Sequence, residues 1–478
     1  MKLVLLWTDV ALWLMVVAAA GYAWRVRALA HLRTTWRRVL RDPVAASAGV
    51  VMALFLLVTL ADSVHLRRAL EAAGEPAAYD THTLSALDLL LARQIAMREV
   101  SYSVPLGTHG FSKESLLDAQ GQARRDYPRL AFGGAHLADP ATQWWGDVAR
   151  RTAAGLAAGV VITGLLAALA VAALARHHQG WRRALADLAA DRTDYPLRAV
   201  LITLGVVLLL AGPVIALAPH YHVLGTDRTG NDVLVLALKS VRTAFVIGAL
   251  STLATLPVAL LLGVLAGYYK GWVDDIIQYL YTTLSAVPNV LLIAACVLMV
   301  QVYFDKNAEL FETAAERADL KMLVLCLILG LTGWAGLCRL VRAETLKLRE
   351  LDYVQAATAF GVGDLRIMAR HILPNVMHLV LITVVLSFSE LILYEAVLTY
   401  VGVGVDPSTS SFGSMINLAR AEMSRDPVVW WSFAAAFASM VSLVLAANLF
   451  ADGVRDAFDP KARSARPRVF QRRGGGDA

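Results

Sequence analysis

Nine long apolar runs dominate this sequence and constrain its fold more than any other feature. Each run is about 20 residues or longer, and at about 1.5 Å per residue a helix of that length crosses the hydrocarbon core of a bilayer. The runs lie at about 3–24, 44–65, 152–175, 199–218, 242–267, 274–301, 321–341, 376–402 and 428–451. We therefore expect an all-α polytopic membrane protein with about nine transmembrane helices.

The composition of the chain supports this interpretation. Of its 478 residues, 58% are apolar and 17% are charged, whereas soluble globular chains have about 45–50% and about 25%. This balance excludes a soluble enzyme, a disulfide-bonded scaffold and a disordered chain. The three cysteines all lie inside apolar runs, so we interpret them as small buried hydrophobic residues. The chain has a net charge of +6. In a membrane protein an excess of Lys and Arg is typical of the loops that face the cytoplasm, so we expect no nucleic-acid partner.

The charged loops predict the orientation of the chain. The stretch 25–42 contains six arginines and one acid, and the tail 461–478 contains six basic residues and one acid. Both should lie on the cytoplasmic side, because Lys and Arg are retained there. The acidic loop 303–320 suits the outer side. An odd number of spans then places the N-terminus outside and the C-terminus inside.

The first 198 residues contain three of the nine spans and one large polar insert at about 66–151. The acids and bases of this insert nearly balance. The apolar residues of Leu84–Arg98 recur with a helical period, which predicts a helix there. The charges of the flanking loops place the insert outside. The first apolar run is also compatible with a cleaved signal peptide, since it follows Lys2 and contains Ala18-Ala19-Ala20. Its length and the acid Asp9 favour an uncleaved anchor instead.

The sequence contains no pattern typical of catalysis. It has no Gly-x-x-x-x-Gly-Lys-Ser/Thr loop to hold nucleotide phosphates, no paired-histidine or cysteine spacing for a metal, and no Ser/His/Asp constellation. His177-His178 lies beside arginines, and we interpret this pair as part of a solvated loop. We therefore expect no enzyme activity, no catalytic residue, no metal site and no cofactor bound by this chain. Energy for uphill transport would come from a partner or an ion gradient.

The most informative polar segment is the predicted cytoplasmic stretch 342–375, RAETLKLRELDYVQAATAFGVGDLRIMARHILPN. It predicts two short helices separated by Gly361-Val362-Gly363, with Asp364 as the N-cap of the second helix. Pro374 suits the opening turn of the eighth span. Ala356-Ala357 leaves a low surface, where the groove of another protein can approach the backbone. The alternative interpretation is a simple interfacial loop between two spans.

This stretch resembles the EAA loop of ABC-transporter permease subunits, whose pattern is Glu-Ala-Ala, three residues, Gly and a distal Leu-Pro. Here the pattern appears as Gln355-Ala356-Ala357, Gly361 and Leu373-Pro374. Gln355 replaces the usual Glu, which keeps a polar side chain and removes its charge. By this resemblance Asp352–Phe360 is a coupling helix. The coupling loop then comprises Asp352, Tyr353, Gln355, Ala356, Ala357, Gly361, Asp364, Leu373 and Pro374.

Three further stretches are similar to the second membrane subunit of the dipeptide, oligopeptide and nickel permease family. They are LGTDRTGNDVL at 224–234, with Asn231 where the family has Arg, AGYYKGWVDD at 266–275 and NLFADGVRDAFDP at 448–460. The resemblance covers about 199–460, which we expect to be a six-helix ABC-importer permease core with the coupling loop 342–375. Residues 1–198 then form an N-terminal extension without a family counterpart, and 461–478 form a basic cytoplasmic tail.

The resemblance implies a multi-pass subunit of the bacterial inner membrane that transports peptides or similar small solutes and catalyses no reaction itself. Its implied partners are a second permease subunit, two ABC ATPase subunits that bind the ATP, a periplasmic substrate-binding protein and the lipid bilayer. From the residues alone, two other classes stay open. One is an ion-gradient-driven secondary transporter, and the other is a membrane-anchored sensor or scaffold.

Two acids lie within the eighth span. Glu390 falls near its middle, where a charge is costly unless it is paired or hydrated, so it is a candidate pathway residue that attracts an amino group or a cation. Helix packing around a protonated acid is the alternative. Glu395 is the second candidate, although its similarity to a Glu that the family often carries there favours a structural role. Pro257 and Pro288 should kink the fifth and sixth spans.

A short turn before the fifth span lies on the predicted outer side. Gly230 suits a tight backbone turn, and the aspartates suit turn or cap hydrogen bonds. The turn is either a docking lip for a binding protein or purely structural. Its candidate residues are Gly225, Thr226, Asp227, Gly230 and Asp232.

Overall fold

The computed structural model describes residues 2–69, 79–117, 123–176, 180–307, 309, 311 and 313–458. Within these ranges, nine helices are long and apolar enough to cross a bilayer, which confirms the predicted number. They are α1 (Trp7–Ala28), α3 (Pro43–Asp62), α6 (Pro140–Ala175), α8 (Leu197–Leu217), α9 (Val233–Tyr269), α11 (Asn289–Lys306), α12 (Ala314–Arg349), the continuous helix Asp364–Val401, and α17 (Trp431–Phe458). His177-His178 and the tail 461–478 lie outside the described residues.

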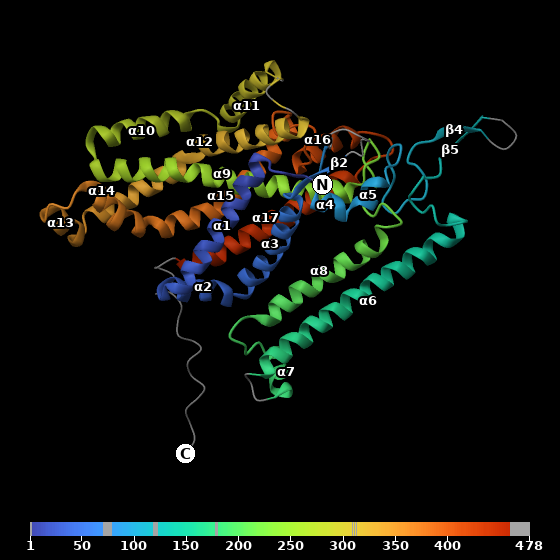
Figure 1. Cartoon of the computed structure of the whole chain (residues 1–478), viewed down its shortest axis with the longest axis horizontal. Coiled ribbons are helices and arrows are strands. Elements are labelled where there is room, and N and C mark those ends of the chain that lie inside the picture. Colours follow the sequence, from blue (N-terminus) through green and yellow to red (C-terminus); the bar gives the residue numbers. More distant parts are fainter. Residues whose placement is uncertain are drawn as a thin grey trace.

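The molecule has two distinct ends (Figure 1). One end carries α13 (Asp352–Ala359) and α14 (Asp364–Ile367), and the opposite end carries β4 (Glu114–Leu117) and β5 (Ala123–Asp126). α2 (Ala30–Arg41) packs on the last turn of α17, where the rings of Trp36 and Phe458 meet edge to face at 5.7 Å between centroids. The arginine-rich stretch and the candidate coupling loop therefore lie toward the same end (Figure 1).

α9 and α12 pack closely along much of their length because glycines face the contact. A Cβ at Gly267 of α9 would lie 2.8 Å from the carbonyl oxygen of Arg342, and a Cβ at Gly330 of α12 would lie 2.9 Å from that of Ser251. Small residues at such positions let two backbones approach each other in a membrane. This pair of helices forms the centre of the molecule, and α15 (Leu373–Val401) packs on both.

The sixth predicted span consists of two helices and not of one kinked helix. α10 (Gly271–Ala286) ends before Pro288, Val287 is extended, and α11 starts at Asn289. Proline has no N–H for the helical ladder, and it disfavours helical geometry in the residue before it. Pro257, in contrast, lies inside the continuous helix α9, as predicted. The break at Pro288 faces the site described below.

α6 and α8 form a hairpin, connected through α7 (Trp181–Ala189), that leans away from the central helices (Figure 1). Its two backbones are in direct contact, since a Cβ at Gly155 would lie 2.5 Å from the carbonyl oxygen of Gly212. Gly159, one turn further along α6, meets the Leu208 carbonyl oxygen in the same way. The hairpin is therefore tightly packed within itself.

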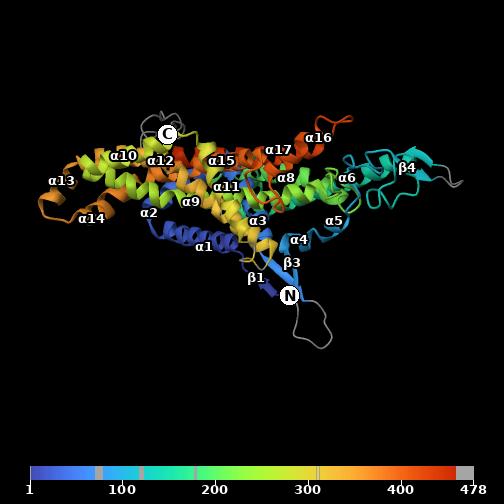
Figure 2. The ribbon, with the colours of Figure 1, turned by 90° about the horizontal axis from the view of Figure 1, so that it is seen from above.

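In the part of the chain that the structure describes, five short strands add a small β component to the predicted all-α architecture. β1 (Lys2–Val4), β2 (His65–Ala69) and β3 (Tyr79–Ser85) form an antiparallel sheet in the order β1-β2-β3. β4 (Glu114–Leu117) and β5 (Ala123–Asp126) form a hairpin that projects from the molecule (Figure 2). The helical pattern predicted after β3 is present as two short helices, α4 (Ala86–Leu90) and α5 (Ala92–Ala96).

Buried and half-buried charged residues connect α1 and the insert to the central helices. Arg242 of α9 donates a hydrogen bond to Asp9 of α1 at 2.6 Å, and Lys239 donates one to Asp88 of α4 at 2.7 Å. Charged groups are tolerated in such places when they are paired. Because these polar residues have partners, α9 begins at Val233, well before the predicted start of the fifth span at 242.

Candidate functional site

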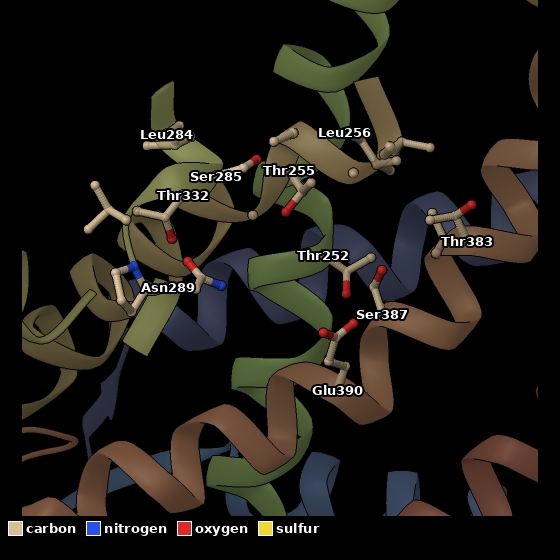
Figure 3. Close-up of a pocket in the computed structure, with 17 residues that line it drawn as sticks. Thr252, Thr255, Leu256, Leu284, Ser285, Asn289, Thr332, Thr383, Ser387 and Glu390 are labelled. Atoms are coloured by element: carbon tan, nitrogen blue, oxygen red, sulfur yellow. The ribbon is translucent and has the colours of Figure 1, made fainter. Parts of the chain in front are cut away.

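A cavity of about 470 Å³ lies among α9, α12 and α15. The exposed side chain of Glu390 extends into it from α15, and its carboxylate lies near Thr252 and Ser387 (Figure 3). The remaining wall includes the break between α10 and α11, where Pro288 and Asn289 line the cavity. The cavity thus combines one carboxylate with hydroxyl and amide groups, all of which can hydrogen-bond to a polar solute.

The sequence prediction identified Glu390 but missed the hydroxyl groups around it. Thr383, Ser387 and Glu390 are spaced i, i+4, i+7 and therefore share one face of α15. Thr252 and Thr255 of α9 are spaced i, i+3 and share a face in the same way. This helical spacing of polar side chains inside apolar runs was the signal that could have revealed the cavity.

Glu395, the second candidate acid, does not line this cavity. It is fully buried, and its Oε1 accepts a hydrogen bond from Thr399 Oγ1 at 2.8 Å. The Val405 N–H in turn donates to the same Thr399 hydroxyl at 3.3 Å. Glu395 therefore takes part in the hydrogen bonding that holds the chain beyond α15 against the end of that helix.

The candidate coupling loop is held in place from two sides. The Tyr268 hydroxyl at the end of α9 donates to Asp364 Oδ1 at 2.9 Å. The Asn375 side chain at the start of α15 donates to the Tyr353 hydroxyl of α13 at 3.1 Å. Lys270 forms a further ion pair with Glu350 at 2.7 Å. The loop is thus attached both to the α9–α10 turn and to the helix that carries Glu390.

Two details of this loop differ from the prediction. Asp364 is not an N-cap, since Gly363 occupies that position and has no side chain to cap the helix. The carboxylate of Asp364 binds Tyr268 instead, a partner that is distant in sequence. Pro374 lies in the first turn of α15, as predicted, but the helix starts upstream at Asp364 and reaches α15 through a π-helical turn, Met368–Ile372.

The tip of the loop is apolar and exposed. Gly361 has a φ of +74°, and the flanking side chains Phe360 and Leu365 are 88% and 76% exposed. Ala356 and Gln355 are also exposed, whereas Ala357 is half-buried and packs on the core. Exposed apolar side chains gathered at one tip are typical of a surface that binds another protein.

The turn before α9 is covered by the insert. A Cβ at Gly230, where φ is +77°, would lie 1.9 Å from the Glu99 carbonyl oxygen, and a Cβ at Gly225 would lie 2.6 Å from that of Ser103. The buried Thr226 hydroxyl donates to the Ser101 carbonyl oxygen at 2.9 Å. These three candidate residues therefore bind the chain's own insert.

The two aspartates of this turn organise its backbone. Asp232 caps α9 by accepting the Leu234 N–H at 2.8 Å, and its other oxygen lies 2.9 Å from His222 Nδ1. Asp227 accepts the backbone N–H groups of Thr229 and Asn231 within the turn, each at 2.8 Å.

A buried charge cluster accompanies this contact. His222 lies between Asp232 and Glu99, with its Nε2 at 3.5 Å from Glu99 Oε1. Burial alone would lower the pKa of His222, but the two carboxylates raise it to about 9. For Glu99, burial alone would raise the pKa, but His222 and backbone N–H groups of the loop 131–133 lower it to about 2. Both groups are therefore charged near neutral pH.

Comparison with known proteins agrees with this architecture. Residues 259–464 match the family described as "Binding-protein-dependent transport system inner membrane component". The oligopeptide transport system permease protein OppC of Mycobacterium tuberculosis strain H37Rv is 31% identical over 245 residues, which cover 51% of this chain and 78% of the relative. The glutathione transport system permease protein GsiD of Pectobacterium atrosepticum is 34% identical over 245 residues, covering 51% and 74%. The di/tripeptide transport system permease protein DppC of Pseudomonas aeruginosa is 33% identical over 242 residues, covering 51% and 73%.

The fold and these similarities define a helical, multi-pass membrane permease and not an enzyme. The chain belongs to the family of inner membrane components of binding-protein-dependent transport systems. It is accordingly a permease subunit of an ABC importer in the bacterial inner membrane, and its family works with ATPase and substrate-binding partners. The resemblance predicted from the coupling loop and the three further stretches is confirmed.

Proposed function

We propose that this chain and a second membrane subunit together form the pathway by which peptides or similar small solutes cross the membrane. The relatives named above are permeases for oligopeptides, glutathione and di- or tripeptides. The observation that carries the proposal is Glu390, an exposed acid in a cavity of a predominantly apolar span. An acid there is costly unless it is paired or hydrated, and the ammonium group of a passing peptide would pair with it.

The loop that contains α13 and α14 is, in this proposal, the surface that docks on the ATPase. Two ATPase subunits bind the ATP, and this chain binds none. The exposed Phe360 and Leu365 would enter an apolar groove of the ATPase, and Gly361 lets the chain turn sharply between them. Tyr353 and Asp364 hold the loop to the ends of α15 and α9 and so fix its angle.

Movement of the loop would reach the cavity through one continuous helix. Asp364–Val401 has 38 residues and carries the coupling loop at its start and Glu390 in its second half. Closure of the ATPase subunits around ATP would push on α13 and rock this helix between outward-facing and inward-facing arrangements. The packing of α15 on α9 and α12, which also line the cavity, supports such a coupled movement.

Residues 199–460 are, in this proposal, the permease core, residues 1–198 are an added extension, and 461–478 are a basic cytoplasmic tail. The N-terminus and the insert face outward, and the coupling loop faces the cytoplasm. The insert covers the turn at 225–232. A periplasmic substrate-binding protein that approaches this side would therefore contact the insert and not the turn itself.

The test is reconstitution of the full chain with its second membrane subunit, ATPase subunits and binding protein in proteoliposomes. We expect ATP-dependent peptide uptake, and we expect Phe360→Asp to lose both uptake and copurification of the ATPase. Leu418→Asp is the matched control, because Leu418 lies on α16 (Phe412–Glu422), outside the coupling loop, and is also well exposed. Uptake driven by an ion gradient without ATP would instead indicate a secondary transporter with Glu390 as its relay.

A further inference from the structure

A long apolar groove lies on the flank of the molecule, away from the cavity that contains Glu390. Its walls are α3, α8 and α17, its floor includes Leu238 and Val241 of α9, and its volume is about 730 Å³. Figure 1 shows α3, α17 and α8 in this region, on the side where the α6–α8 hairpin leans away. Almost all lining side chains are apolar, and the groove follows α3 from Pro43 to Val58.

The length of this groove accommodates an acyl chain. From Pro43 to Val58 the helix rises by about 22 Å, which exceeds the half-thickness of about 15 Å of a bilayer core. An acyl chain that enters from one face of the bilayer can therefore lie along the groove over its whole length.

A polar hollow of about 360 Å³ adjoins the groove at the start of α3, and Pro43 lines both. The hollow contains Arg41 from the end of α2 and Asp191 and Asp194 from the segment before α8. The Arg41 guanidinium lies 3.7 Å from the Asp194 carboxylate, and both side chains are largely exposed. One cation and two carboxylates thus share the mouth of an apolar groove.

The helices on both sides of this mouth are suited to the membrane surface. α2 is amphipathic and contains Arg33, Arg37, Arg38 and Arg41, and α7 is amphipathic and begins with an exposed Trp181. Amphipathic helices with basic residues and aromatic anchors lie at the boundary between headgroups and acyl chains. The hollow is therefore at the depth of lipid headgroups, and the groove extends from it into the hydrocarbon.

We propose that this groove and hollow bind one phospholipid with a zwitterionic, primary-amine headgroup, phosphatidylethanolamine. The phosphate binds Arg41, the ammonium binds Asp191 and Asp194, and an acyl chain fills the groove between α3, α8 and α17. A lipid with an anionic headgroup and no amine would leave the two carboxylates facing negative charge. A quaternary amine would have no N–H to donate to them.

The test measures lipid retention by native mass spectrometry of the full chain, purified in detergent and incubated with phosphatidylethanolamine, phosphatidylglycerol or phosphatidylcholine of identical acyl chains. We expect the wild type to retain at least about tenfold more phosphatidylethanolamine than either of the others, the ratio expected from charge-assisted hydrogen bonds. Ser442→Phe, which fills the groove from α17, should abolish retention of phosphatidylethanolamine, and Arg41→Gln should lower retention of all three lipids, because the phosphate is common to them.

Two matched variants control for general effects. Val441→Phe places the same ring on the neighbouring exposed position of α17, outside the groove lining, and Arg37→Gln removes a charge from α2 outside the hollow. Both should retain lipid as the wild type does. Equal retention of the three lipids, or equal loss in Ser442→Phe and Val441→Phe, would overturn the proposal. So would crosslinking of a photoreactive residue at Ser442 to the second membrane subunit in the assembled transporter.

Discussion

At the scale of single residues, Glu390 and Glu395 illustrate how one helix gives the same side chain two different environments. The two acids are five positions apart on α15, so they point in different directions. Glu390 is exposed in the cavity among α9, α12 and α15, whereas Glu395 is buried and hydrogen-bonded to Thr399. We therefore expect substitution of Glu390 to impair solute uptake and substitution of Glu395 to impair stability.

Glu390→Gln should weaken solute uptake without unfolding the protein. Loss of a charge-assisted hydrogen bond of about 1.5 kcal/mol raises the KM for a peptide with a free amino terminus roughly tenfold. The measurement is uptake of a tripeptide with a free amino terminus and of its N-acetylated form in proteoliposomes. For the acetylated peptide, wild type and variant should have the same KM. Glu395→Gln is the matched control, and it should change thermal stability more than KM. An unchanged KM in Glu390→Gln would contradict the pathway assignment.

Gly230→Ala should detach the insert from the turn before α9. The φ of +77° costs alanine about 1–2 kcal/mol, and the new Cβ would in addition overlap with the Glu99 carbonyl oxygen. We expect faster cleavage of the insert by a protease and a lower thermal unfolding temperature. Gly402→Ala is the control, because Gly402 has a φ of +90° and no atom near the Cβ position. Equal effects of the two substitutions would show that backbone strain alone is responsible.

At the scale of elements, the candidate coupling loop is short and is held by side chains from both neighbouring spans. Tyr268 near the C-terminal end of α9 and Asn375 at the beginning of α15 each bind one of its helices. The bond from Tyr268 connects α14 to the wall of the cavity that α9 provides. Loosening it should leave the fold intact and reduce the transmission of movement.

Tyr268→Phe removes the hydroxyl that donates to Asp364 and keeps the ring in the core. We expect ATP hydrolysis by the assembled transporter to continue while uptake per ATP falls about three- to tenfold, because the net loss is about 1 kcal/mol at a moving joint. Tyr269→Phe is the matched control, because Tyr269 is the next residue, its ring is exposed and its hydroxyl does not bond to the loop. Parallel loss of hydrolysis and uptake in Tyr268→Phe would argue against a coupling role.

The elements also show where sequence reasoning succeeds and where it fails. The apolar runs predicted nine spans because a bilayer demands about 20 apolar residues for each crossing. The start of α9 was missed because Lys239 and Arg242 interrupt the run, and their partners Asp88 and Asp9 lie more than 150 positions away. The prediction of Asp364 as an N-cap was wrong for the same reason. Capping rules consider only neighbouring residues, whereas the partner of Asp364 is the distant Tyr268.

At the scale of the whole molecule, buried contacts join the insert to the long helices α9 and α17. Glu99, His222 and Asp232 form a buried cluster that joins them, and Trp431 of α17 donates to the Thr226 carbonyl oxygen nearby. The polar composition of the insert predicted that it folds, but no local pattern indicated that it covers the turn at 225–232. Contacts between segments this distant in sequence are determined by the tertiary fold.

The charge cluster predicts how attachment of the insert depends on pH. The pKa of Glu99 is lowered from 4.5 to about 2, so its contribution to stability is complete above about pH 4.5 and is lost as the pH falls toward 2. The pKa of His222 is raised from 6.5 to about 9, so its contribution is complete below about pH 6.5 and is lost as the pH rises through 9. Protease resistance of the insert should therefore be greatest between about pH 4.5 and 6.5.

His222→Gln is the control for the alkaline limb. The variant has no imidazolium to lose, so it should be less stable than wild type at pH 6 and should show a flatter profile between pH 6.5 and 9. Thermal unfolding of the full chain in detergent, followed across this range, gives the comparison. Parallel profiles for wild type and variant would exclude His222 as the titrating group.

The contact between the insert and the turn also constrains how the protein is made. Ser101 and its partner Thr226 are separated by 125 positions, which a ribosome elongating at roughly 5–20 residues per second covers in about 6–25 s. During that interval the insert has been synthesised, while the surface that will bury Glu99 and Ser103 does not yet exist. Until then, the part of the insert that binds this turn lacks its partner surface, and slower translation between these two positions lengthens that interval.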